Sequence, residues 1–458
     1  MEVGFDTVGN ATIIAYDRGP VLVTDPWLRG SAYFGSWTFS HQVPDEQMLA
    51  ASSCPYVWVS HGHPDHLSSE SLRLLKIKTL LLPDHVGSRI ADDLRNEGYD
   101  VQVLHDKRWY KLSDRIRILC LADYNQDGIL LIDINGRLVV NFNDSSERGW
   151  GQFVRKVIQQ FPISFLLRLS GYGDADMINI FNESGERLLP VQAAHRLPVG
   201  NEIAVMMRDL RANHFIPFSS MHRYQRSDSV WADEHTTGLE DYAVGFDSRA
   251  GILLPAFIRY DCLTDTCQTL NPPEQERRIH RPEEFGDNWS DLLEADELLA
   301  VRNYFTGIEH LGDHFDYFNF RIGGRDNIVE LGKGKYDRAI TFAVPRNSLM
   351  TAIRHHIFDD LLIGNFMRTT LHGKFGNAGL YPDFTPYVTK YADNGLARSK
   401  EELAEYFRKY MQRAPFEYLR GRVRNAAKDV IRDRFAADSS TYRLARRAYH
   451  LIKASPFS

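Results

Sequence analysis

Residues 57–67, which read Val-Trp-Val-Ser-His-Gly-His-Pro-Asp-His-Leu, hold the densest group of potential metal ligands in the chain. The four candidates are His61, His63, Asp65 and His66. They follow an apolar run that predicts a short strand, and Gly62 and Pro64 predict a tight, stiff loop after it. The first two histidines would face one metal, and the aspartate and third histidine would face a second about 3.5–4 Å away. A polar loop with incidental histidines is the alternative, which this spacing disfavours.

This H-x-H-x-D-H loop resembles the signature of the metallo-β-lactamase superfamily. The resemblance implies an αββα sandwich with a metal site along one edge of its two sheets. It also implies roles for three further strand-end residues. Asp25 would support the metal loop without binding metal, Asp144 would bridge the two metals, and His222 would bind the second metal. Taken singly, Asp25 could be a turn residue and His222 a surface histidine, but their order along the chain favours the ligand interpretation.

The strand end before Asp144 departs from the superfamily pattern. Hydrolases of the superfamily usually supply a third histidine there, whereas this chain reads ILCLADYNQDG, in which Asp123 would take the position. The expected ligands are then His61, His63 and Asp123 for the first metal, Asp65, His66 and His222 for the second, and Asp144 between them. Two histidines and a terminal carboxylate on each metal suit non-haem iron and oxygen activation better than hydrolytic zinc. We therefore expect two metal ions, with iron favoured over zinc or manganese.

Four segments look like the CMP-N-acetylneuraminate hydroxylase branch of the superfamily. They are VTDPWLRGSAYFGSW, LADYNQDGILLIDINGRLVVNFND, PFSSMHRYQRSDS and FDDLLIGNFMR, the last of which lies beyond the expected metal domain. That family hydroxylates the N-acetyl group of a sialic acid nucleotide with oxygen, and it normally carries a Rieske iron–sulfur domain. This chain has neither the C-x-H nor the C-x-x-H pair that such a cluster needs. We therefore expect either a separate reductase or the substrate itself to supply electrons.

Three residues that flank expected ligands are candidates for holding an anionic small-molecule substrate: Tyr124, Arg223 and Tyr224. An Arg fork suits phosphate or carboxylate. Each of the three is also compatible with a purely structural or surface role.

The surrounding elements predict an α/β fold. Residues 1–260 alternate short strands with helices and hairpins, including an Asn135-Gly136 turn, and would form the metal domain. Residues 261–299, rich in charge and proline, would be a linker to a smaller α+β module at 300–397. Residues 398–458 form a basic, amphipathic helical segment with 15 Lys and Arg against 7 Asp and Glu. A solvated helix face explains that charge better than docking to an acidic partner.

Composition narrows the class of protein. The 458 residues carry a net charge of −6, which does not favour nucleic-acid binding, and four cysteines are too few for a disulfide scaffold. The N-terminus lacks signal-peptide features, and no apolar run approaches the roughly 18 residues of a membrane span. We expect a cytoplasmic, multi-domain protein and leave homo-oligomerisation open.

Three functions remain compatible with the sequence. The favoured one is a dinuclear iron oxygenase or hydroxylase that acts on a small polar substrate such as a nucleotide sugar. The second is a dinuclear zinc metallohydrolase of a phosphodiester, amide or lactone, in which the metals lower the pKa of a shared water to about 7. The third, a non-enzymatic scaffold that keeps the fold, is disfavoured because all the ligands of the H-x-H-x-D-H loop are present.

Overall fold

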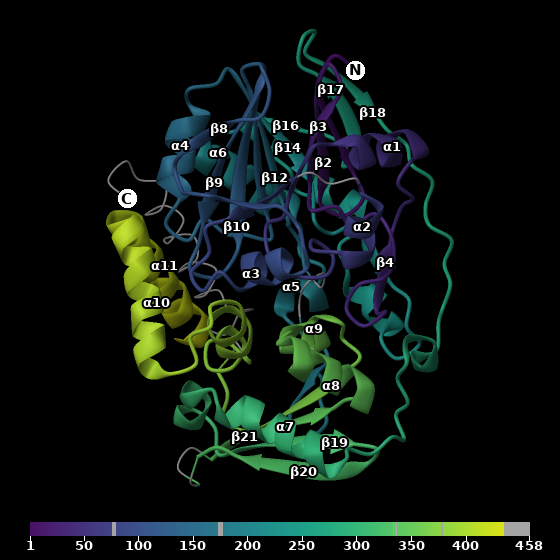
Figure 1. The fold of residues 1–458 in the computed structure, drawn as a ribbon, viewed down its shortest axis with the longest axis vertical. Coiled ribbons are helices and arrows are strands. Elements are labelled where there is room, and N and C mark those ends of the chain that lie inside the picture. The colour runs from purple at the N-terminus through teal and green to yellow at the C-terminus, as the bar shows by residue number, and fades with distance from the viewer. Residues whose placement is uncertain (76–78, 173–176, 333, 335–336, 377–378, 435–458) are drawn as a thin grey trace.

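The computed structural model describes residues 1–75, 79–172, 177–332, 334, 337–376 and 379–434. Two sheets packed face to face form its upper part (Figure 1). The first sheet has the order β18-β17-β1-β2-β3-β5-β6-β7. Its strands are β1 (Val3–Val8), β2 (Thr12–Asp17), β3 (Pro20–Thr24), β5 (Tyr56–Trp58), β6 (Thr79–Pro83), β7 (Val101–Leu104), β17 (Ile258–Asp261) and β18 (Thr266–Thr269).

The second sheet has the order β16-β14-β12-β11-β10-β9-β8. Its strands are β8 (Trp109–Lys111), β9 (Ile116–Ala122), β10 (Gly128–Ile134), β11 (Arg137–Asn143), β12 (Ile163–Arg168), β14 (His214–Pro217) and β16 (Ile252–Leu253). Asn135 and Gly136 join β10 to β11 with φ angles of 49° and 80°, as a two-residue hairpin turn requires, so this prediction is confirmed.

Helices cover the outer face of each sheet, which explains why the central strands are apolar on both sides. Between the sheets, Phe5, Trp58 and Leu81 of the first contact the same buried cluster as Leu130 and Phe165 of the second. The first sheet is covered by α1 (Asp45–Ser53), α2 (Ser69–Leu74) and α3 (Arg89–Asn96), and the second by α4 (Gly151–Ile158) and α6 (Gly200–Leu210). The result is the expected αββα sandwich.

A third sheet forms the lower module, with the order β13-β22-β21-β19-β20. It contains β13 (Ile180–Phe181), β19 (Tyr317–Ile322), β20 (Arg325–Glu330), β21 (Arg338–Ala343) and β22 (Arg368–Gly373). Three helices pack with it, α7 (Ala295–Thr306), α8 (Arg346–His355) and α9 (Phe358–Ile363). The edge strand β13 of this module therefore comes from residues 1–260. That segment was expected to form the metal domain alone.

The segment between the sandwich and the lower module differs from the expected linker. Residues 266–269 form β18, which pairs with β17 and extends the first sheet beyond residue 261. The chain then runs down one side of the molecule to the lower module (Figure 1). Short bridges from His41 to Glu274 and from Arg226 to His280 hold it against the sandwich.

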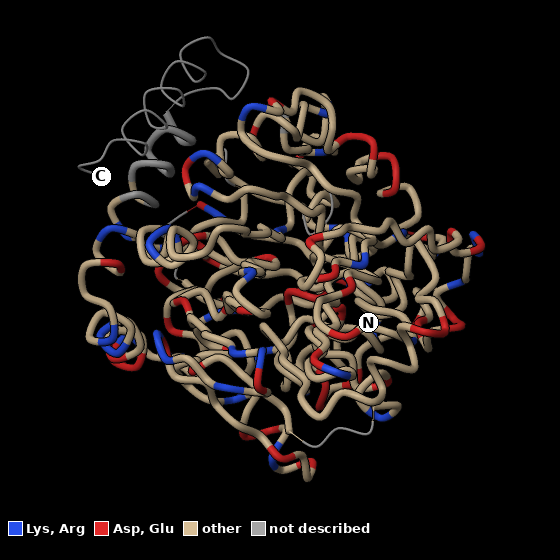
Figure 2. Tube along the Cα trace, turned by 90° about the horizontal axis from the view of Figure 1, so that it is seen from above, with Lys and Arg blue, Asp and Glu red and all other residues tan. Residues whose placement is uncertain are grey.

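The C-terminal segment is helical, as expected, over α10 (Lys400–Arg413) and α11 (Pro415–Arg434), and its remainder, 435–458, lies outside the described residues. α10 buries Tyr406 and Tyr410 against Val86 and Ala122 of the sandwich. Acidic and basic positions are interspersed along the described trace (Figure 2). None of the described helices has both the length and the apolar character needed to cross a bilayer.

Candidate metal centre

The expected ligands come from strand ends that meet at one edge of the sandwich. β3 pairs in parallel with β5, and β11 pairs in parallel with β12, so the carboxyl ends of neighbouring strands lie together. Residues 60–66 follow β5, and Asp25 and Asp144 follow β3 and β11. The backbone N–H groups of His66 and Leu67 both donate to the carbonyl of His63, which closes the metal loop into a tight turn before α2.

Asp144 lies between the histidines of the loop. Its Oδ2 is 3.8 Å from Nε2 of His61 and 3.3 Å from Nε2 of His66. Nε2 of His66 is also 3.3 Å from Oδ2 of Asp65, and Nε2 of His61 is 2.9 Å from Nδ1 of His63. The structure thus brings five of the expected ligands close together, with Oδ2 of Asp144 near both His61 and His66.

His222 begins β15 (His222–Tyr224), which pairs with β4 (Trp37–Phe39). Its imidazole lies flat on the indole of Trp37, with ring centroids 3.4 Å apart. Burial lowers the pKa of His222 to about 3, and the charge of Asp65 only partly opposes this. His222 is therefore a neutral imidazole next to the same carboxylate that contacts His66.

Buried polar atoms at this edge test whether metal fits. Among the described residues, neither nitrogen of His222 nor Oδ1 of Asp144 has a hydrogen-bond partner, although all three atoms are buried. An unsatisfied buried polar atom costs about 1–3 kcal/mol. A metal that accepts a lone pair from the imidazole and from the carboxylate would remove that cost, so the donor set fits metal ions.

Asp25 hydrogen-bonds the metal loop from the end of β3. Its Oδ1 accepts hydrogen bonds from the backbone N–H of Ser60 at 2.7 Å and from the Ser60 hydroxyl at 2.9 Å. Its Oδ2 accepts from the side-chain amide of Asn143 and lies 3.5 Å from Nδ1 of His66. Because the Ser60 hydroxyl has only one hydrogen, which it gives to Asp25, it must accept from Nδ1–H of His61, 2.9 Å away. Nε2 of His61 then carries a lone pair toward the cluster.

Asp65 is held by two residues that sequence reasoning did not identify. The Tyr33 hydroxyl donates to Oδ1 of Asp65 at 2.6 Å, and the Asn10 side-chain amide donates to Oδ2 at 2.9 Å. Tyr33 and Phe34 both have positive φ, 51° and 57°, a strained conformation that places the tyrosine ring beneath the metal loop. Tyr33 falls within the first of the four segments that resemble the hydroxylase family, which was the signal that could have identified it.

Removing the Tyr33 hydroxyl tests this support. We expect Tyr33→Phe to weaken metal binding about 10-fold, because Asp65 loses one of the bonds that orient it while the ring keeps its packing. Competition with a chromophoric chelator measures the change. Tyr16→Phe is the matched control, since Tyr16 donates a 2.9 Å bond to buried Asp6 in the first sheet. An equal loss of affinity in both variants would contradict a specific role for Tyr33.

The structure does not bring Asp123 into this cluster. Its carboxylate pairs with Arg148 at 2.9 Å and accepts from the backbone N–H of Asn125 at 2.7 Å. Arg148 also pairs with Asp127 at 2.7 Å, and Asp127 pairs with Lys390 at 3.2 Å. A largely buried guanidinium is stabilised by such anionic partners, so Asp123 helps to neutralise Arg148 in this arrangement. Sequence patterns did not reveal these long-range pairs.

The three candidate substrate residues contact protein partners. Tyr124 packs against Phe407 and Tyr418 beneath the C-terminal helices. Arg223 pairs with Glu274 at 2.6 Å. The hydroxyl of Tyr224 accepts a 2.7 Å bond from the side-chain amide of Asn365 in the lower module. Of the three, only the ring of Tyr224 also contacts an expected ligand, since it packs edge-on against His222 with ring centroids 5.7 Å apart.

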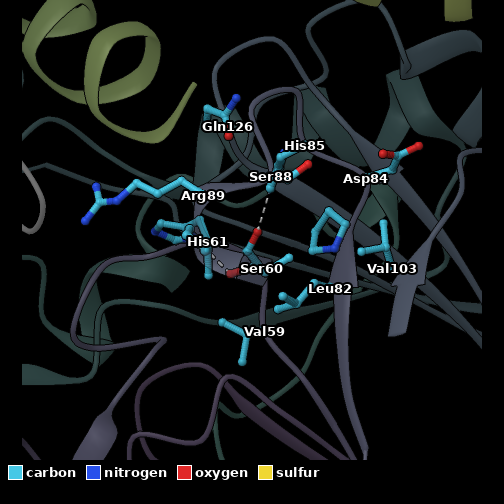
Figure 3. A pocket seen from close by; sticks show the side chains of 13 residues that line it. Val59, Ser60, His61, Leu82, Asp84, His85, Ser88, Arg89, Val103 and Gln126 are labelled. Carbon is cyan, nitrogen blue, oxygen red and sulfur yellow. Dashed lines mark hydrogen bonds between the residues drawn. The ribbon is translucent and has the colours of Figure 1, made fainter. Parts of the chain in front are cut away.

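A hollow beside His61 lies behind the metal loop, between the ends of β5 and β6 and the start of α3 (Figure 3). His85 lines it, and one of its ring nitrogens lies 3.2 Å from the carbonyl oxygen of Ser60. Burial lowers the pKa of His85 to about 4, so the ring is neutral and its Nε2–H donates to that carbonyl. This hydrogen bond helps to fix the position of Ser60, whose hydroxyl contacts His61.

The αββα sandwich with histidines and carboxylates at its edge defines a metallo-β-lactamase fold with a candidate metal site. No protein-family model matches the chain. It is similar to cytidine monophosphate-N-acetylneuraminic acid hydroxylase of Mus musculus, 22% identical over 311 residues, which cover 62% of this chain and 53% of the mouse protein. The hydroxylase of Danio rerio is 27% identical over 314 residues, which cover 61% and 49%. The chain thus spans about half the length of these relatives.

Among solved structures, CmlA, a diiron beta-hydroxylase from Streptomyces venezuelae, aligns with a TM-score of 0.34 and 15% identity over 59% of this chain and 54% of its own. An isothiocyanate hydrolase from Delia radicum gut bacteria aligns with a TM-score of 0.31 and 15% identity, covering 48% and 85%. Scores of this size carry no argument about function. The sequence relatives and the geometry of the site together support a metal enzyme of the metallo-β-lactamase superfamily.

Proposed function

We propose that this protein is a dinuclear non-haem iron oxygenase or hydroxylase that acts on a small polar substrate such as a nucleotide sugar. The observation that carries the proposal is the position of Asp144 Oδ2 between His61 and His66. The donors at the site are imidazoles and carboxylates, with no thiolate among the described residues that surround it. Such a set suits iron, although ligand type also admits zinc and manganese.

We propose one assignment of ligands to the two metals. His61 and His63 would hold the first metal, Asp65, His66 and His222 the second, and Asp144 would bridge them. Asp123 enters this set only if its pair with Arg148 opens. Bound iron would supply oxygen activation, while the residues of the chain fix the positions of the metals and exclude water by burying the ligands.

The substrate class and the electron source extend the proposal. Similarity to hydroxylases of a sialic acid nucleotide supports a nucleotide sugar or a related polar molecule. A separate reductase or the substrate would supply the electrons for such a hydroxylation.

A zinc metallohydrolase is the second candidate, because a carboxylate that bridges two metals also suits a shared, activated water. Asp144 would then hold both metals around that water, and the same ligands would serve. The two candidates differ in the metal they require.

Metal content distinguishes the candidates. On protein prepared anaerobically from cells without added metal, we expect elemental analysis to find about two irons per chain, and oxidation to give near-ultraviolet and visible absorption. His105→Ala is a control for adventitious binding, since His105 is an exposed histidine paired with Asp84. Two zincs without iron uptake would favour the hydrolase, and a chain that binds no metal would overturn both proposals.

A further inference from the structure

Helix α9 of the lower module faces the edge of the sandwich that carries the metal cluster (Figure 1). Its second residue, Asp359, places Oδ2 2.8 Å from Nε2 of His63. The histidine side chain is 14% exposed and the aspartate 7%, so this contact between modules is shielded from solvent. Residues 296 positions apart in the chain thus meet at the metal loop.

The contact determines which nitrogen of His63 carries hydrogen. An ionised carboxylate only accepts hydrogen bonds, so Nε2 of His63 must be the N–H donor. In the neutral ring, which is the form that can bind metal, Nδ1 then carries the lone pair, and it lies 2.9 Å from Nε2 of His61. Ser60 leaves that nitrogen of His61 with a lone pair as well. Two lone pairs at this distance repel each other unless a proton or a metal ion lies between them.

We propose that Asp359 is a positioning residue that the lower module supplies to the metal centre. It orients the ring of His63 and selects the tautomer in which Nδ1 can bind metal. This inference rests on the proposed metal site, and it makes docking of the lower module a condition for tight binding at the first metal. Carboxylates that accept from the outer N–H of a ligating histidine act in this way at metal sites generally.

The geometry favours this role over direct ligation by Asp359. His63, Asp359 and the neighbouring Asp360 offer ligand atoms within 4.8 Å of one another, so a cation held by these three is the competing interpretation. Asp359 contacts Nε2, however, whereas His61 lies at Nδ1, and the two nitrogens of an imidazole point in different directions. Asp359 is therefore outside the space that His61 and His63 share.

The test uses the full chain loaded with zinc, which is diamagnetic, with ¹⁵N-labelled histidine. In the wild type we expect His63 to show a metal-bound Nδ1 and a protonated, slowly exchanging Nε2 in long-range ¹H–¹⁵N spectra. Asp359→Ala should weaken binding of one zinc about 10- to 100-fold and speed the exchange of that proton. Asp359→Asn, which keeps the shape and an accepting oxygen, should give an intermediate loss and guards against a folding defect in the alanine variant.

Asp393→Asn is the matched control. Asp393 is a buried carboxylate of the same module that accepts a 2.5 Å bond from the Tyr304 hydroxyl, and its replacement should leave both readouts unchanged. Unchanged zinc affinity and spectra in Asp359→Ala would overturn this inference but leave the proposed function standing. If Asp359→Ala loses one zinc while the Nε2–H signal of His63 stays intact, the inference is also overturned, because Asp359 would then be a ligand. A wild type that binds no zinc or other metal would overturn the proposed function itself.

Discussion

Replacing Asp144 with alanine is expected to reduce the bound metal from two ions per chain to one or none and to abolish activity. Oδ2 of Asp144 is the atom that lies near both His61 and His66, so one substitution removes a ligand from both metals. The loss should exceed about 100-fold in affinity, the upper end of what removal of an outer hydrogen-bond partner costs. Elemental analysis after gel filtration and chelator competition measure it.

Asp133→Ala provides the matched control for this experiment. Asp133 lies in β10 of the second sheet and faces Leu138 near the start of β11, whereas Asp144 follows the end of β11; the Asp133 carboxylate pairs with Arg117 at 2.8 Å. Its replacement should leave two metals bound. If Asp144→Ala also keeps two metals and full activity, the bridging assignment is wrong.

Replacing Arg148 with methionine should cause the largest loss of stability. Arg148 pairs with Asp123 and Asp127, whose side chains are 0% and 5% exposed. Without the guanidinium, two carboxylates remain buried, and only Asp127 keeps a cationic partner, Lys390. Breaking a buried pair in this way costs about 3–5 kcal/mol, which urea unfolding followed by circular dichroism would measure.

A surface pair supplies the comparison. Arg249 pairs with Asp247, but its side chain is 90% exposed, and Arg249→Met should leave the unfolding midpoint unchanged. Adding Asp123→Asn to Arg148→Met should recover part of the lost stability, because it removes one of the stranded charges. A double variant no more stable than Arg148→Met would argue against the pairing. If the Asp123→Asn variant still binds two metals, that result would support the exclusion of Asp123 from the ligand set.

Residues from three separate segments contact the metal loop. Asp25 holds Ser60 and His66 from the neighbouring strand, Tyr33 holds Asp65 from a strained loop, and Asp359 holds His63 from the other module. Metal affinity is therefore expected to depend on long-range packing as well as on the ligands themselves, because outer partners orient the ligand atoms.

Local features of the chain were sufficient to predict much of the sandwich. The apolar runs, the Asn135-Gly136 turn and the H-x-H-x-D-H spacing are each encoded within a few residues, and strand ends necessarily meet at one edge once the strands pair in parallel. The convergence of Asp144 with the loop histidines depends in addition on the packing of the two sheets, because β11 and β5 belong to different sheets.

The tertiary structure alone decided which groups partner these residues. Asp123 takes the position at which the superfamily's hydrolases usually supply a third histidine, but its carboxylate pairs with Arg148, and Asp359 gave no local sign of reaching His63. β13 likewise leaves its neighbours in sequence to pair with β22. The direction of a side chain and its hydrogen-bond partner depend on packing between segments distant in sequence, and burial makes each charged group take whichever opposite charge the fold brings within reach.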